Sequence, residues 1–151
     1  MSGDASRVFI DTNVLVYAAV LRAPLHEQAR RALQDLASSP SDLRISRQIL
    51  REYAAVLTRS QEFTTPLSGT EVVSDVRRFE HQFKVADDNA AVTDRLMALL
   101  GSVTVHGRQV HDANIVATMQ AYNVNRLLTN NPSDFARYSS IVEVIPLVSG
   151  N

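Results

Sequence analysis

The sequence predicts an α/β fold in which a parallel sheet carries helices on both of its faces. Short apolar stretches recur along the chain and are too short to form helices. Longer segments between them repeat apolar residues every three or four positions, which is typical of helices. Parallel strands need crossover connections, so this alternation favours a parallel sheet whose crossovers are the helices.

The expected strands are short apolar stretches that end in turn-forming residues. They span residues 7–10, 43–45, 84–86, 126–129 and 141–146. The first is followed by Asp11, Thr12 and Asn13, which favour turns and helix N-caps. The fourth is followed by a turn at Asn130, Asn131 and Pro132.

The remaining periodic segments are expected to be helices. One begins in the apolar stretch 14–21, and others span about 24–38, 47–59, 70–83 and 110–122. Pro24 fits the first turn of its helix. Asp88 or Asn89 can cap a further helix that runs to Leu100.

Composition fits one domain over residues 1–151, with 45% hydrophobic and 21% charged residues. The chain contains no cysteine, which excludes disulfides and thiolate metal sites. The formal net charge of −1 argues against a generic nucleic-acid binder, unless acids concentrated in one pocket hide a basic rim. No apolar run is long enough for a bilayer and residues 1–7 form no signal core, so we expect a cytoplasmic protein without a membrane.

A functional site is expected among the residues that follow the strands, because ligands of such sheets bind beyond the carboxyl ends of the strands. Asp11 directly follows the first strand. Aspartate is also a favoured N-cap, so helix capping is the alternative role for Asp11.

Two further acids interrupt apolar helix faces. Glu52 shares a face with Ile49 and Val56, although burial of a lone carboxylate is costly. A glutamate at the edge of the stripe, reaching solvent or an arginine, is the alternative. Asp112 shares a face with Ile115, and its alternative role is to stabilise the helix dipole from the first turn.

Asp134 follows the strand 126–129, at the end of the sheet where ligands are expected. It also stands three residues after Asn131, with Pro132 between them, which resembles a capping box. Capping is therefore an alternative role for Asp134.

One hypothesis accounts for all four acids, because carboxylates that converge in a cleft repel one another unless a hard cation joins them. Mg²⁺ and Mn²⁺ take oxygen ligands, and Mg²⁺ also contacts substrate phosphates. Such ions ready a water and stabilise the oxygens of a phosphodiester during hydrolysis. The proposed ligands are Asp11, Glu52, Asp112 and Asp134.

Four segments resemble, in order and spacing, the motifs of the PIN domain family, and within it bacterial VapC-like toxins. They read VFIDTNVLVY at 8–17, ILREY at 49–53, GRQVHDANIVA at 107–117 and LLTNNPSDF at 127–135. The resemblance implies a compact three-layer α/β/α domain with a central parallel sheet. It also implies endonucleolytic cleavage of RNA with Mg²⁺ or Mn²⁺.

The resemblance assigns roles to individual residues. It implies that Asp11 and Asp112 hold the metal, helped by Glu52 and a residue of the fourth motif. Residues expected to orient the site are Thr12, Asn13, Thr129 and Asn131. Many relatives carry an aspartate at the place of Asn131, whereas Asp134 belongs to an Asp-Phe ending of many relatives with asparagine there. Which of the two faces the metal is left open.

Partners follow from the same resemblance. VapC-like proteins usually dimerise and bind an antitoxin, so a homodimer and an antitoxin partner are expected besides the RNA substrate. The residues from Val14 to Leu21 are apolar on more than one side, which suits a partner contact or a core. Arg47, Arg51 and Arg59 lie on or near the Glu52 helix and could contact RNA phosphates, with a solvated helix face as the alternative.

Two other enzyme and signalling classes that place an aspartate at a strand end fit these residues less well. A haloacid-dehalogenase phosphatase needs a second aspartate where this chain has Asn13. A response-regulator receiver needs a lysine after a late strand, and Lys84 is badly placed for that. An inactive PIN fold that binds RNA or a protein partner remains the alternative, supported by Asn131.

Overall fold

The sheet at the centre of the molecule is parallel throughout, with strands in the order β3-β2-β1-β4-β5. The computed structural model describes residues 7–38 and 42–148. The strands are β1 (Arg7–Ile10), β2 (Asp42–Ser46), β3 (Lys84–Ala86), β4 (Arg126–Thr129) and β5 (Glu143–Pro146). The predicted α/β class with a central parallel sheet is confirmed.

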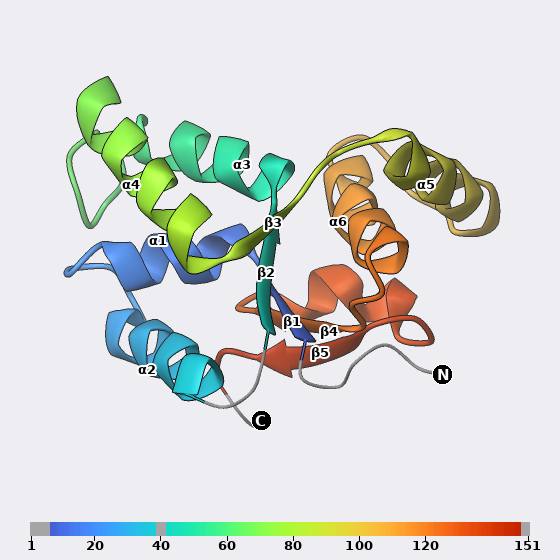
Figure 1. The fold of residues 1–151 in the computed structure, drawn as a ribbon. Helices are drawn as coiled ribbons and strands as arrows, with labels where there is room; N and C mark the ends of the chain where they lie inside the picture. Colours follow the sequence, from blue (N-terminus) through green and yellow to red (C-terminus); the bar gives the residue numbers. More distant parts are fainter. Residues whose placement is uncertain (1–6, 39–41, 149–151) are drawn as a thin grey trace.

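Helices cover both faces of the sheet and complete a three-layer α/β/α arrangement (Figure 1). They are α1 (Thr12–Ala19), α2 (His26–Ser38), α3 (Arg47–Leu57), α4 (Gly69–Gln82), α5 (Ala90–Ser102) and α6 (Gln109–Ala121), with a 3₁₀ helix η1 (Pro132–Tyr138). In Figure 1 the helices α1 to α4 lie on one side of the strands, and α5 and α6 lie on the other.

Three predicted element boundaries shift for local reasons. Pro24 stands in the turn before α2 rather than in its first turn, because Leu25 adopts a positive φ of 59°. The first helix begins at Thr12, with Asp11 as its N-cap. The last strand begins at Glu143, since the backbone N–H groups of Ile141 and Val142 donate to Tyr138 O in the turn that follows η1.

Central strand β1 is buried along most of its length. Val8, Phe9 and Ile10 are at most 1% exposed, as expected for a strand covered by helices on both faces. Phe9 is in register with Arg44 of β2 on one side and Leu127 of β4 on the other. The strand therefore ties together the first and last thirds of the chain.

The strand order defines where a ligand would bind. The chain builds the sheet outward from β1 through β2 to β3, then returns to add β4 and β5 on the opposite side. The order thus reverses between β1 and β4, and crevices at such switch points are the usual ligand sites of open parallel sheets. Asp11 and Thr129 stand at the carboxyl ends of these two strands.

The apolar residues of α1 are mostly used inside the molecule. Val14, Leu15 and Val16 are buried in the core, whereas Leu21 after the helix is 80% exposed. The burial of these residues within one chain does not test the predicted homodimer, which stays a prediction. Within residues 7–38 and 42–148, no helix combines the length and the apolar character needed to cross a bilayer.

Candidate active site

An open cleft of about 500 Å³ lies at the carboxyl ends of β1 and β4. Its lining comes from α1, α3, α6, the 61–64 turn and the start of η1. The four acids selected from the sequence all line it: Asp11, Glu52, Asp112 and Asp134. The fold therefore brings together in one cleft four carboxylates that are far apart in the chain.

Asp11 forms the floor of the cleft and is only 7% exposed. Its Oδ1 accepts a hydrogen bond from the backbone N–H of Thr12 at 2.8 Å, so the residue also caps α1. Its Oδ2 accepts from Thr129 Oγ1 at 2.7 Å and from Asn13 Nδ2 at 3.3 Å. Burial raises the pKa of Asp11 above its ordinary value, although the bonds from Thr129 and Thr12 oppose this. Capping and a place in the cleft thus coexist in one residue.

Glu52 is held from two sides and is half-buried. Its Oε1 accepts from Thr12 Oγ1 at 2.7 Å, and its Oε2 accepts from Gln48 Nε2 at 2.8 Å. The side chain thus turns into the cleft rather than toward an arginine or bulk solvent. The unusual position of Glu52 in an apolar helix face is explained by these donors.

Gln48 joins the acidic residues to α6 and was not selected from the sequence. It is 5% exposed, and its Nε2 also donates to the backbone oxygen of His111 at 2.8 Å. Its Oε1 accepts from Asn114 Nδ2 at 2.8 Å. The sequence feature that could have identified Gln48 is its position one helical turn before Glu52, on the same helix face.

Asp112 lies in the first turn of α6 and faces the other acids. Within the described residues, no group donates a hydrogen bond to its carboxylate. Burial, followed by the nearby charges of Asp11, Asp134 and Glu52, raises its pKa to about 7, with Arg137 opposing the shift. These three carboxylates all act on Asp112, so the four acids share one electrostatic environment.

Asn131 and Asp134 both line the cleft. Asn131 precedes η1 but forms no side-chain cap, so the predicted capping box is absent. Its backbone N–H instead donates to Thr129 Oγ1 at 3.0 Å. Asp134 is exposed and contributes to the raised pKa of Asp112.

The residues expected to orient the site are hydrogen-bonded within it. Thr12 and Thr129 donate to carboxylates, as described above. Asn13 donates to Asp11, and its Oδ1 accepts from the backbone N–H of Asn130 at 3.0 Å. The loop after β4 is thereby fixed to the start of α1.

The carboxylates are loosely spaced for a metal site made only of protein ligands. Over residues 7–38 and 42–148, no three histidine or acidic side chains form a group close enough to hold a metal ion by themselves. Mg²⁺ commonly binds through one or two carboxylates and keeps several waters, so an all-oxygen cleft of this kind fits such an ion. Asp112, whose carboxylate has no donor in the described residues, and Asp11 beside it are the suitable pair.

A second cleft of similar size differs from the first in that its carboxylates have hydrogen-bond donors. It measures about 520 Å³ and lies between α1, α3 and α4. Its two carboxylates are already occupied, since Asp75 accepts from Tyr53 Oη at 2.7 Å and Glu71 completes a capping box with Ser68. Of these two clefts, the one at the strand ends is the one whose described lining residues include a carboxylate without a donor, that of Asp112.

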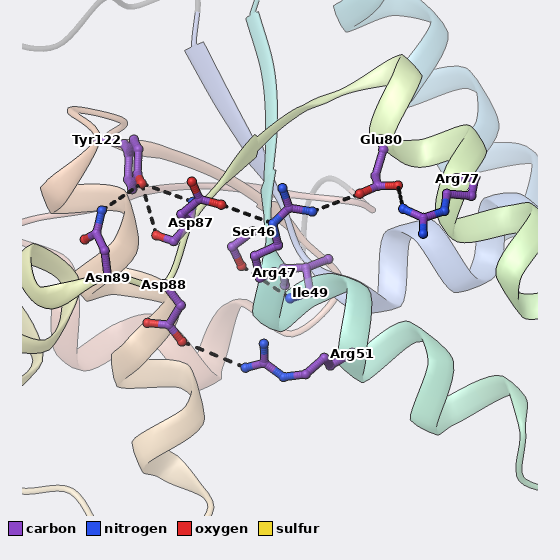
Figure 2. A network of polar contacts seen from close by, with 10 residues as sticks. All are labelled: Ser46, Arg47, Ile49, Arg51, Arg77, Glu80, Asp87, Asp88, Asn89 and Tyr122. Atoms are coloured by element: carbon purple, nitrogen blue, oxygen red, sulfur yellow. Dashed lines mark hydrogen bonds and ion pairs between the residues drawn. The ribbon is translucent and has the colours of Figure 1, made fainter.

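Arg47 and Arg51, the expected phosphate contacts, lie outside the lining of this cleft. Figure 2 shows Arg47 between Glu80 and Asp87, and Arg51 facing Asp88. The ion pairs of Arg47 measure 2.9 Å to Glu80 and 3.2 Å to Asp87, and that of Arg51 measures 3.8 Å. These pairs link α3 to α4 and to the segment before α5. An RNA contact by Arg47 would compete with two carboxylates, and its role in binding remains a prediction.

Comparison with known proteins identifies the fold family. The sequence model of the PIN domain matches residues 8–140. The chain belongs to the PIN domain family. This PIN domain is 27% identical over 130 residues to Ribonuclease VapC24 of Mycobacterium tuberculosis, which covers 85% of this chain and 89% of that protein. The predicted resemblance to VapC proteins is confirmed.

Solved structures agree on the architecture. VapBC2 from Rickettsia felis, bound to a DNA fragment from its promoter, matches this PIN domain with a TM-score of 0.65 and 22% identity, over 91% of this chain and 98% of the other. VapC20 of Mycobacterium tuberculosis, a sarcin-ricin loop cleaving toxin, matches with a TM-score of 0.64 and 17% identity, over 90% and 96%. At these identities the neighbours establish the fold.

Proposed function

We propose that this PIN domain is a metal-dependent endoribonuclease that hydrolyses RNA phosphodiester bonds. The observation that carries the proposal is the convergence of Asp11, Glu52 and Asp134 on Asp112, whose pKa they and burial raise to about 7. Perturbed acids in a cleft at a topological switch point are typical of a catalytic site. The naming of the related VapC24 as a ribonuclease supports the same activity.

The residues of the cleft have different proposed roles in binding a cation. Asp11 and Asp112 would hold Mg²⁺ or Mn²⁺, with Glu52 and Asp134 acting directly or through water. When bound, the ion supplies an activated water and neutralises charge on the phosphate. Thr12 fixes the orientation of Glu52, and Thr129 fixes that of Asp11. Asp112 must lose its proton for the cation to bind, which its pKa of about 7 permits at neutral pH.

We further propose that residues 1–151 act as one nuclease domain and as the toxin of a toxin–antitoxin pair. A matched solved structure is a toxin–antitoxin complex from Klebsiella pneumoniae, with a TM-score of 0.62 and 21% identity. An antitoxin partner and a homodimer follow by analogy with such proteins. An enzyme of this kind would meet its RNA in the cytoplasm.

Cleavage of a mixed RNA pool tests the activity. Purified protein is incubated with Mg²⁺, Mn²⁺ or EDTA beside Asp11→Asn, Asp112→Asn and the control Asp94→Asn, an exposed acid on α5. We expect cutting only with metal, a loss of roughly 100-fold or more in the two cleft variants, and no change in the control. Full metal-dependent activity of Asp112→Asn would contradict the site assignment.

An inactive binding module is the second candidate, favoured by Asn131 where many relatives carry an aspartate. The same protein samples distinguish the two functions by thermal denaturation. A cation that binds the folded state raises the melting temperature as its concentration increases. No cutting under any condition, together with no Mn²⁺-dependent shift, would favour the binding module.

A further inference from the structure

The lining of the cleft also contains a set of side chains, called the wall below, whose chemistry differs from that of the acids. Apolar side chains from α1 and α3 line it together with an aromatic residue of the following turn and two arginines. They are Val16, Tyr17, Val56, Phe63, Arg59 and Arg108. A metal site alone does not require such a wall, so its composition reports on what else the cleft holds.

Two aromatic rings form the apolar part of this wall. The centroids of Tyr17 and Phe63 are 6.4 Å apart, with an angle of 77° between the ring planes. Both side chains are half-buried and pack against the hydrophobic core while still lining the cleft. The pair thus offers an aromatic surface next to the acids.

The turn that carries Phe63 is anchored to α3. Gln61 and Thr64 exchange backbone hydrogen bonds at 3.3 and 3.4 Å. Gln61 Nε2 donates to Val56 O at 2.8 Å, and Leu67 N donates to Leu57 O at 2.7 Å. The aromatic surface is therefore formed before any ligand binds, which lowers the entropic cost of binding.

The two arginines of the wall have N–H donors that form no hydrogen bond within the described residues. Arg59 uses its Nε for Ala55 O at 3.1 Å, and in the described residues neither Arg59 nor Arg108 forms an ion pair. Arg108 is exposed at the start of α6, directly after Gly107, whose φ of +55° glycine adopts without strain. Arg47, in contrast, is held by two carboxylates outside the cleft.

We propose that this wall binds an unpaired stretch of RNA, with a base stacked on Tyr17 and Phe63 and the backbone phosphates on Arg59 and Arg108. The inference rests on the proposed nuclease function and identifies the residues that position its substrate. Bases stack on aromatic side chains with little sequence preference, and arginine contacts the flanking phosphates. A base within a duplex is already paired and stacked, so it cannot lie against a ring inside a cleft.

Binding is measured in an Asp112→Asn background, where cleavage is disabled. The probe is a fluorescein-labelled 12-nucleotide RNA without self-complementarity, and a second copy carries 2-aminopurine to report stacking. The variants are Phe63→Leu, Arg59→Gln and Arg108→Gln. Arg95→Gln is the matched control, since Arg95 is exposed on α5 and outside the cleft.

Phe63→Leu is expected to raise the Kd about 5-fold or more and to abolish the change in 2-aminopurine fluorescence. Each arginine variant is expected to raise the Kd and to lower the slope of log K against log salt by about 0.7. Phe63→Tyr should restore binding. The control should bind as the parent does, and a duplex of the same sequence should bind more weakly.

Parent-like binding by all three wall variants, an equal loss in Arg95→Gln, or equal affinity for the duplex would overturn the proposal. The arginines are exposed, so their variants test it even if Phe63→Leu does not fold. Cleavage by the unmodified protein is followed in parallel. If the unmodified protein cleaves RNA but the wall variants bind like the parent, the wall proposal is wrong and the nuclease proposal stands. If binding depends on the wall but the unmodified protein does not cleave RNA, the wall proposal stands and the nuclease proposal is wrong.

Discussion

At the scale of one residue, the ionised carboxylate of Asp112 lowers the stability of the folded chain. Its carboxylate is half-buried near three others and accepts no hydrogen bond from the described residues. Ionisation of such a group is unfavourable in the folded chain, whereas the unfolded chain leaves it in water. Unfavourable ionisation of clustered carboxylates is common at sites that bind a cation, because the bound cation offsets their repulsion.

The raised pKa of Asp112 predicts how stability depends on pH in the absence of metal. Between the ordinary aspartate value of 3.8 and about 7, the folded state binds more protons at this site than the unfolded state. The contribution of Asp112 to stability is therefore greatest at low pH and falls as the pH rises toward 7. We expect Asp112→Asn to raise the melting temperature at pH 7.5 in EDTA and to flatten its dependence between pH 5 and 8.

Thermal denaturation at several pH values, followed by circular dichroism, measures this effect. Asp94→Asn on α5 serves as the control, because Asp94 is exposed and outside the cleft. An unchanged melting temperature for Asp112→Asn at pH 7.5 would show that Asp112 is not strained by its neighbours.

At the scale of the elements, Gln48 joins α3 to α6 across the cleft. The one side chain donates to Glu52 and to the backbone of His111, and it accepts from Asn114. Loss of Gln48 leaves several half-buried polar groups without partners, which typically costs about 1–3 kcal/mol for an unsatisfied buried group. It also releases Glu52 on one side.

Gln48→Ala is expected to lower the free energy of unfolding by about 1–3 kcal/mol and to reduce RNA cleavage roughly 10-fold to 100-fold. Urea denaturation and the RNA cleavage assay measure the two effects. Gln28→Ala on the exposed side of α2 is the control and should change neither. If Gln48→Ala lowers stability but cleaves at the parental rate, the orientation of Glu52 does not depend on Gln48.

At the scale of the whole molecule, the polar contacts of Figure 2 stand apart from the cleft. Arg47 links the start of α3 to α4 and to the segment before α5, where Tyr122 Oη accepts from the backbone of Asp87 at 3.0 Å. These contacts are exposed, and exposed ion pairs contribute little to stability. They link α3, α4 and the segment before α5 on the outside of the sheet.

Arg47→Gln separates a structural role from an RNA contact. We expect a melting temperature lower by about 3 °C or less and an unchanged Kd for RNA. Differential scanning fluorimetry and fluorescence anisotropy give the two values. A Kd that rises as much as in Arg59→Gln would instead place Arg47 on the path of the RNA.

The strands and the acids could be predicted because their signals are local. The apolar run before Asp11 and the acid within the Glu52 helix face are visible without any knowledge of the fold. Contacts between distant segments could not be predicted in this way. Asn114 and Gln48 are 66 positions apart, and Arg47 and Asp87 are 40 apart, so only the packing of the helices shows that these pairs meet. Arg108 stands in the third motif, four residues before Asp112, but only the packing of α6 shows that its side chain lines the cleft.

The bond between Thr129 and Asp11 spans 118 positions, because β1 pairs with β4. A chain that is still being made on the ribosome therefore holds Asp11, Glu52 and Asp112 before it holds the strand that orients the first of them. Asp134 emerges later still. We therefore expect the proposed nuclease activity to arise only after β4 has been synthesised, so that the messenger and the ribosome are spared until then.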